Sequence, residues 1–398
     1  MEPKLGCPWA DEMVLNPAFI ADPVTDRLHM LFRASGPWPQ KRRDGQPLPY
    51  PIFLGYAWSD DGGETWEADF SRPALAPALH EEADKLVVVR ADGRRVVNHA
   101  NGCIEDPRLF WLEGQLYLTT ACRMFPPGPY WEGTALDCCV PDWAKRGRHD
   151  LGSAATNNVT VSVLWHVDLE KLIARRYEEA FAYVTHLTDP ERGDNRDVFL
   201  FPEKLTLNGR SMYVCLHRPW NPSAYDVARG VKAPSIMLAA ADELDDLATD
   251  AAEQHLLATP ALDWESNRIG ASWPPIRLND GEWLLAHHGK SERVGYTQSF
   301  MVLREQDRGW PVITHRCGDR LMYAKQEWEL NGKFPTPVLF TCAGQRVGSD
   351  LIMTYGAADT KAGVAWTDFD DLVRHVRQFD ASGKRTAAVK ATRPTVAV

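Results

Sequence analysis

Four short segments combine carboxylates with cations or with groups that bind hydroxyls. They are residues 102–108 (GCIEDPR), 195–204 (NRDVFLFPEK), 216–219 (LHRP) and 355–360 (YGAADT). Cleavage of a glycosidic bond needs an acid for the leaving oxygen and a nucleophile or activated water at the anomeric carbon. We therefore treat these segments as candidate parts of a site that breaks such a bond.

The run Glu105-Asp106-Pro107-Arg108 is the first candidate. Proline restricts the residue before it, which predicts an extended Asp106. Arg108 is placed to orient or charge-pair with one of the two carboxylates. A structural ion pair at the start of a strand, with no catalytic role, would give the same sequence pattern. The spacing therefore leaves both interpretations open.

The other three segments carry the same ambiguity. Glu203 and Lys204 are adjacent, His217 and Arg218 add two donors, and Asp359 follows a Gly-containing strand end. A structural ion-pair cluster and a turn-capping Asp are the alternatives.

His287 and His288 are adjacent, which suggests a metal pair at first sight. Neighbouring residues on a strand point to opposite faces, so we predict no metal site. The eight scattered cysteines form no C-x-x-C pattern and are expected to be reduced core thiols.

The elements that must position these groups recur along the chain as an apolar strand that runs into an acidic turn. Strand centres at Ala57, Val163, Met237, Met301 and Ala365 are separated by 106, 74, 64 and 64 residues. Further strand-like segments lie within each step. Several short strands repeated five times predict an all-β, five-bladed β-propeller with few short helices. A two-sheet β-sandwich is the alternative.

The first copy contains an Asp-box, the S-x-D-x-G-x-T-W turn at 59–66. In this motif the Asp folds back on turn amides, Gly takes a positive φ and Trp packs beneath. We therefore predict a structural hairpin turn here and no catalytic role.

Length and charge limit the remaining possibilities. The 398 residues show no linker between two halves, which favours one propeller domain over 1–380. A net charge of −10, with no basic tract and no long apolar run, predicts a cytoplasmic protein that binds neither nucleic acid nor membrane. Residues 124–157 form an insertion expected near the pocket, and 381–398 are expected to be a disordered tail.

Taken in order, the segments resemble glycoside hydrolase family 130, which contains β-mannoside phosphorylases and β-mannoside hydrolases. The resemblance begins in 16–20 (NPAFI) and 31–34 (LFRA) and passes through 104–108 and 197–204. It continues through 216–219 and 268–276 (RIGASWPPI) and ends at 355–360, covering most of the chain except the insertion and the tail.

Membership would imply a five-bladed propeller and inversion at the anomeric carbon. The family's general acid maps onto Asp106. Its sugar-binding positions map onto Asn16, Arg33, Asp359 and Asp197, and we expect Arg108 to contribute to substrate binding as well.

The expected acceptor site is less complete. Family phosphorylases hold phosphate with two arginines and a lysine; Lys204 matches the lysine and Arg123 the first arginine, with His217 nearby. The second arginine is replaced by the sequence 157–160 (NNVT), so Arg146 or Arg148 of the insertion would have to substitute. Without it, water becomes the acceptor and Glu203 or Glu105 the candidate base.

The sequence thus predicts an inverting, exo-acting enzyme that cleaves β-mannoside-type bonds in short oligosaccharides, with a slight lean to hydrolysis. A phosphorylase that releases mannose 1-phosphate is the alternative. A non-catalytic glycan-binding propeller and a protein-interaction propeller are further alternatives. No cofactor is expected beyond inorganic phosphate as co-substrate of a phosphorylase. The expected partners are a small oligosaccharide substrate and a second copy of the chain in a homo-oligomer.

Overall fold

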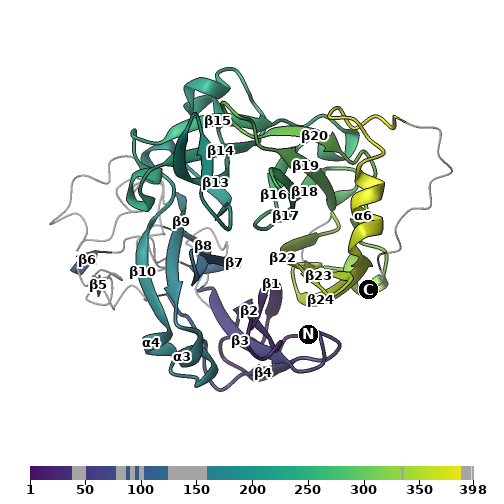
Figure 1. Ribbon diagram of the computed structural model, residues 1–398. Helices are drawn as coiled ribbons and strands as arrows, with labels where there is room; N and C mark the ends of the chain where they lie inside the picture. Colours follow the sequence, from purple (N-terminus) through teal and green to yellow (C-terminus); the bar gives the residue numbers. More distant parts are fainter. Residues whose placement is uncertain are drawn as a thin grey trace, which may run out of the picture.

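Five β-sheets are arranged around a common centre in the computed structural model, which describes residues 1–37, 51–77, 87–89, 95–97, 103–123, 159–332, 336–386 and 396 (Figure 1). The first strands of the sheets contact one another near the centre, where β1 meets β7 and β22, and β11 meets β16. This is the predicted five-bladed β-propeller.

The first two blades hold four antiparallel strands each. The strands of the first are β1 (Met13–Ala21), β2 (Leu28–Ser35), β3 (Phe53–Ser59) and β4 (Glu67–Asp69). Those of the second are β7 (Glu105–Leu112), β8 (Gln115–Arg123), β9 (Thr160–Val167) and β10 (Phe181–His186). A separate hairpin consists of β5 (Val87–Val89) and β6 (Arg95–Val97).

The other three blades complete the ring. The third holds β11 (Asn195–Leu200), β12 (Leu205–Leu207), β13 (Arg210–Pro219), β14 (Ile236–Ala241) and β15 (Glu253–Ala258). The fourth holds β16 (Arg268–Ala271), β17 (Ile276–Asn279), β18 (Glu282–Ser291), β19 (Gly295–Arg304), β20 (Val312–Arg316) and β21 (Met322–Tyr323). The fifth holds β22 (Leu339–Val347), β23 (Asp350–Ala357) and β24 (Lys361–Asp368).

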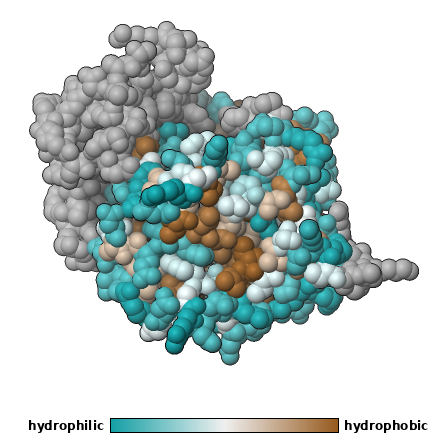
Figure 2. All heavy atoms as spheres, turned by 90° about the horizontal axis from the view of Figure 1, so that it is seen from above, coloured by the Kyte–Doolittle hydropathy of each residue, from teal (hydrophilic) through white to brown (hydrophobic). Residues whose placement is uncertain are grey.

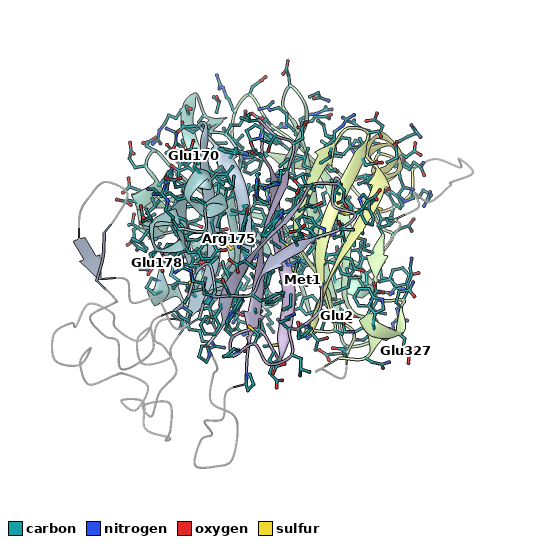
Figure 3. All side chains as sticks on the ribbon, turned by 90° about the horizontal axis from the view of Figure 1, so that it is seen from below. Met1, Glu2, Glu170, Arg175, Glu178 and Glu327 are labelled. Atoms are coloured by element: carbon teal, nitrogen blue, oxygen red, sulfur yellow. The ribbon has the colours of Figure 1, made fainter. Side chains whose placement is uncertain are left out.

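The helices are short and lie outside the ring of inner strands. The α-helices within the described ranges are α3 (Leu169–Ile173), α4 (Tyr177–Ala180), α5 (Glu327–Leu330) and α6 (Phe369–Val376). The 3₁₀ helices are η4 (Pro190–Arg192), η5 (Pro222–Ala224), η6 (Asp226–Ala228), η7 (Leu244–Ala248) and η8 (Asp263–Glu265). Figure 3 shows Glu170, Arg175 and Glu178 of the α3–α4 segment on the outside of the second blade.

The five predicted repeats occupy equivalent places in the fold. They fall in β3, β9, β14, β19 and β24, each of which pairs with the second long strand of its blade. Because both faces of a blade pack against neighbours, β14 is buried along its whole length and reads as a continuous apolar run, IMLAAA. Among the described residues, three large apolar clusters form the core, and a small fourth one surrounds Met237.

The Asp-box forms the β3–β4 turn as predicted. Asp61 Oδ1 accepts hydrogen bonds from the Thr65 backbone N–H at 2.9 Å and the Ser59 hydroxyl at 2.7 Å. Gly62 has a φ of 72°, and the ring of Trp66 lies 6.2 Å from that of Phe19. The motif therefore stabilises this hairpin turn.

The first and fifth blades meet at a seam closed by backbone pairing. The Met1 amine donates to the Ala362 carbonyl at 2.7 Å, and the Ala362 N–H returns a bond of 3.0 Å. Glu2 pairs with Lys361 at 2.5 Å. Figure 3 shows Met1 and Glu2 between the strands of these two blades. These contacts tie the two ends of the ring of blades together.

The structure describes none of the predicted insertion and only part of the predicted tail. The 124–157 insertion, with Arg146 and Arg148, lies outside the described residues. Within the predicted tail, Arg385 pairs with Asp319 at 2.8 Å and the Thr386 N–H donates to the Gln378 carbonyl at 2.8 Å. The expectation of a disordered tail over 381–398 stays a prediction.

The side of the ring seen from above is largely hydrophilic, with a band of hydrophobic residues across its middle (Figure 2). Among the described residues, no helix is long and apolar enough to span a membrane. The expectation of a homo-oligomer stays a prediction.

Candidate active site

The candidate site lies where the inner strands begin, and three of these strands share a backbone feature there. Asn16 in β1, Asp106 in β7 and Asp197 in β11 have φ values of 45°, 52° and 55°. Each lies in a shift of strand register, a β-bulge, which turns one polar side chain out of the normal alternation. Asn and Asp tolerate this left-handed conformation better than other non-glycine residues. The prediction that Pro107 holds Asp106 extended is therefore wrong.

Asp106 is buried and held from two sides. Its Oδ1 accepts a hydrogen bond of 2.8 Å from Asn16 Nδ2 and one of 3.0 Å from Arg33 Nη1. Burial raises the pKa of this carboxyl, but the charges of Arg33 and Arg108 outweigh it and leave the pKa below its ordinary value. Asp106 is thus ionised at neutral pH in the free protein and must gain a proton before it can act as an acid.

Glu105 sits beside it between two arginines. Its Oε2 lies 2.9 Å from Arg33 Nη1 and its Oε1 3.1 Å from Arg196 Nη1. Arg196 also donates to the Thr160 hydroxyl at 3.1 Å. Burial lowers the pKa of Arg196, but the negative charges of Glu105 and Asp106 raise it by a larger amount. The pKa therefore lies above its ordinary value, and Arg196 stays charged.

A buried layer supports these groups from below. Arg108 donates to the Asp106 carbonyl at 2.7 Å and the Ser272 carbonyl at 3.1 Å, and its Nη2 lies 3.3 Å from Asp197 Oδ1. Arg218 donates to Asp197 Oδ2, which also lies 3.3 Å from His288 Nε2. Burial raises the pKa of Asp197, yet Arg218 and His288 hold it well below its ordinary value.

Arg108 and Asp197 were predicted to bind substrate. Arg108 is 1% exposed and Asp197 2%, and their polar atoms form hydrogen bonds within this layer. These contacts fit residues that position the site, and the predicted contact with a sugar stays a prediction.

Asp359 lies in the turn after β23, where Ala358 and Asp359 both have positive φ. Burial raises the pKa of its carboxyl, Arg33 opposes this, and the nearby charges of Asp106 and Glu105 raise it further. Asn16, Arg33, Asp106 and Asp359 are thus contributed by three blades: the first through β1 and β2, the second through β7, and the fifth through the turn after β23.

Two glycines allow this close packing. A Cβ on Gly356 would lie 2.0 Å from Asn16 Oδ1, and one on Gly270 would lie 2.4 Å from Asp197 Oδ2. A side chain at either position would displace a polar group of the site.

Glu203 and Lys204 are not brought to this cluster. Lys204 lies 3.9 Å from Glu113, which follows the far end of β7, and Glu203 pairs with Arg277. Seven residues of extended chain separate Asp106 from Glu113, a span of roughly 20 Å. Neither residue can act at Asp106, so their predicted roles as base and phosphate ligand are corrected.

His217 points away from the cluster. Its Nδ1 lies 3.0 Å from Asn195 Nδ2 and its Nε2 3.1 Å from Gln254 Oε1 of the outer strand β15. Burial lowers its pKa to about 4, so it is neutral at pH 7 and offers no charge to an anion. Adjacent Arg218 faces the site instead because neighbouring strand residues alternate.

Arg123 ends β8 at the same end of the second blade as Glu105, where its backbone pairs with Thr160. It therefore stands near Arg196, as the predicted acceptor site requires. Its role stays a prediction.

Sequence reasoning missed three cations around the cluster: Arg196, Arg268 and Lys290. It named Arg218 only as a donor beside His217. Arg196 and Arg268 stand inside or at the start of segments already singled out by their motifs. Strand alternation about Asp197 and about His217 was the signal available in the sequence. The bulges could not be foreseen in this way, because no residue propensity indicates them.

His287 and His288 face opposite sides, as predicted: His287 Nε2 lies 3.3 Å from Glu265, and His288 lies beside Asp197. In the described part of the chain, no three His, Cys, Asp or Glu residues are grouped to hold a metal ion.

A five-bladed propeller with a buried, hydrogen-bonded carboxyl in a polar, cation-rich site at the centre defines a carbohydrate-active enzyme of the glycoside hydrolase or glycoside phosphorylase kind. The comparisons with known proteins agree. The sequence model of a family described as β-1,4-mannooligosaccharide phosphorylase, glycoside hydrolase family 130, matches residues 153–378. The chain belongs to glycoside hydrolase family 130.

Curated relatives in this family are named as phosphorylases. A 1,2-β-oligomannan phosphorylase of Thermoanaerobacter sp. is 29% identical over 371 residues, covering 93% of this chain and 95% of the relative. A β-1,2-mannobiose phosphorylase of Listeria innocua is 30% identical over 191 residues, or 48% of each chain.

Solved structures show the same fold. The β-1,2-mannobiose phosphorylase from Listeria innocua, in complex with β-1,2-mannobiose, superposes with a TM-score of 0.58 at 16% identity and covers 94% of each chain. A glycoside hydrolase-like structure from Parabacteroides distasonis gives a TM-score of 0.59 at 16% identity, covering 92% of this chain and 93% of that one.

Proposed function

We propose that this enzyme is a β-mannoside phosphorylase that transfers a terminal mannosyl group to inorganic phosphate. This replaces the lean to hydrolysis expected from the sequence. The names of the full-length relatives favour phosphorolysis, and so does the arrangement of charges around Asp106.

The observation that carries the proposal is the pairing of Glu105. Inverting hydrolysis needs a carboxylate free to take a proton from water. Glu105 is fixed between Arg33 and Arg196, at 2.9 and 3.1 Å, and Glu203 is at the other end of the strands. A phosphate oxygen needs no such base, because it is already a nucleophile.

The cations fit a phosphate acceptor. Arg196 on β11 of the third blade pairs with Glu105, and Arg123 ends the strand β8 that pairs with the strand of Glu105 in the second blade. Arg218 is 4% exposed, and its Nη1 has no hydrogen-bond partner among the described residues. Charge-assisted bonds from arginines suit a dianion. The arginine that the 157–160 segment lacks is replaced in this proposal by Arg196.

The reaction balances as follows. A phosphate oxygen attacks the anomeric carbon, the bond to the leaving oxygen breaks, and that oxygen receives a proton from Asp106, directly or through a sugar hydroxyl. Inversion of the β-mannoside gives α-mannose 1-phosphate. The proton lost by phosphate on becoming an ester returns to Asp106. Phosphate also brings negative charge among the arginines, which favours the proton that Asp106 lacks in the free protein.

We assign Asn16, Arg33 and Asp359 to the terminal sugar. Asn16 and Arg33 contact Asp106, and the raised pKa of Asp359 makes it a weakly charged hydroxyl acceptor. The same raised pKa favours a second candidate, hydrolysis with Asp359 as base.

The test incubates the protein with β-1,2- and β-1,4-linked mannobiose with and without phosphate. Mannose 1-phosphate formed only with phosphate supports the proposal, and phosphate-independent release of mannose contradicts it. Asp106→Asn should abolish turnover in either case while sugar binding persists. If mannose is released, Asp359→Asn should stop that release.

A further inference from the structure

Trp220 is an exposed aromatic residue at the rim of the site. It directly follows β13 on the strand end that carries Arg218, and 53% of its surface is exposed. Its backbone N–H donates to the Asp194 carbonyl at 2.8 Å, next to the start of β11. The backbone of Trp220 is therefore fixed next to the start of β11, the strand that carries Arg196.

Arg268 supports this ring from one side. Its guanidinium carbon lies 4.8 Å from the centre of the Trp220 ring and 5.8 Å from that of Tyr296. Its Nε donates to Asn267 Oδ1 at 2.7 Å. Within the described ranges it has no carboxylate within ion-pair distance, so its charge is directed at the aromatic ring.

Arg268 also links Trp220 to the buried site. The ring of Tyr296, which Arg268 also contacts, lies 5.7 Å from that of His288, and His288 Nε2 lies 3.3 Å from Asp197 Oδ2. Gly270, two residues along β16 from Arg268, packs against the same Asp197 oxygen. Trp220 is thus connected through Arg268 and Tyr296 to the buried layer around Asp197.

We infer that Trp220, held by Arg268, is the platform on which the leaving-group sugar packs. The terminal sugar is held at the buried groups Asn16, Arg33 and Asp106, so the rest of the oligosaccharide must extend toward solvent. A pyranose presents C–H groups on its faces, and an exposed indole offers an apolar surface of matching size. This inference rests on the proposed function, and it makes Trp220 a determinant of selectivity for the leaving group.

The experiment compares two substrates that share the terminal sugar and differ in the leaving group, β-mannobiose and methyl β-mannoside. Trp220→Ala should lower kcat/KM for mannobiose by roughly tenfold or more and leave that for methyl β-mannoside within about twofold. Trp220→Phe should recover part of the loss. The KM for phosphate should not change.

Trp310→Ala is the matched control. Trp310 stacks on His255 at 5.3 Å between β19 and β20, near the strand ends opposite Asp106. It should affect neither substrate. Equal losses on both substrates in Trp220→Ala, or no loss on mannobiose, would overturn the inference.

A failure of the proposed function is separable from a failure of this inference. If the wild type releases mannose without phosphate, the same substrate pair is compared by mannose release. If turnover is absent, calorimetry of mannobiose binding to Asp106→Asn with and without Trp220→Ala gives the answer. Unchanged affinity in the double variant would reject the platform.

Discussion

Asn16 Nδ2 lies 2.8 Å from Oδ1 of Asp106, although the two residues are 90 positions apart and belong to different blades. Both have left-handed backbone conformations at bulges of inner strands. The same carboxylate oxygen accepts a bond from Arg33 at 3.0 Å. Two residues of the first blade, Asn16 and Arg33, therefore help to keep Asp106 ionised, together with Arg108 of the second blade.

Asn16→Ala should change the pH dependence of the reaction. The Asn16 hydrogen bond stabilises ionised Asp106 and lowers its pKa, so its removal raises that pKa. Activity that needs protonated Asp106 falls as pH rises through this pKa, so the alkaline limb of kcat/KM should move to higher pH, while kcat/KM itself falls by about 10- to 100-fold. Asn279→Ala is the control, since its amide donates to Glu282 at the far end of the fourth blade. An unmoved limb would contradict the assignment.

Arg196→Ala should weaken phosphate use. Loss of a charge-assisted bond costs about 1.5 to 3 kcal/mol, or roughly 10- to 100-fold in KM for phosphate. The measurement is initial rate against phosphate concentration at saturating mannobiose. Lys204→Ala should leave this KM unchanged because Lys204 lies beside Glu113 and Tyr213 at the other end of the strands. Sensitivity to Lys204 and not to Arg196 would reject the acceptor site.

Asp359→Asn should increase the stability of the fold at pH 7 and weaken substrate binding. The pKa of Asp359 is raised in the folded state, so its ionised form is disfavoured and the wild type loses stability as pH rises through that pKa. The variant should therefore be more stable than the wild type at pH 7 by about 1 kcal/mol or less, with no difference below about pH 4. Its KM for mannobiose should rise. Thermal unfolding at both pH values, with steady-state kinetics, checks both results.

Glu265→Gln should destabilise the fold away from Asp106. Glu265 is fully buried, pairs with Arg316 at 2.5 Å and lies 3.3 Å from His287. Burial raises its pKa, but His287 and Arg316 lower it to about 2. Its stabilising effect is present above the ordinary glutamate pKa and is lost as pH falls from about 4.5 toward 2.

We expect this variant to lose about 3 kcal/mol at pH 7 and to show less acid sensitivity below pH 4.5. Unfolding by urea across this pH range measures both effects. Unchanged acid sensitivity would mean that other carboxyl groups control it.

The sequence by itself determined the architecture. Each blade repeats one apolar strand with an acidic turn, and the five copies occupy equivalent strands because local β-propensity and turn chemistry act within a few residues. The Asp-box was predictable down to its hydrogen bonds for the same reason. The motif around Asp106 also pointed to the right end of β7.

Only the tertiary structure decided which charged residues meet Asp106. Glu203 and Lys204 stand in a motif with Arg196 and Asp197, yet the strand between them carries the two pairs to opposite ends of the blade. His217 and Arg218 are adjacent but face opposite sides of β13. Bulges at Asn16, Asp106 and Asp197 then re-aim single side chains, and such register shifts depend on packing between blades rather than on local sequence.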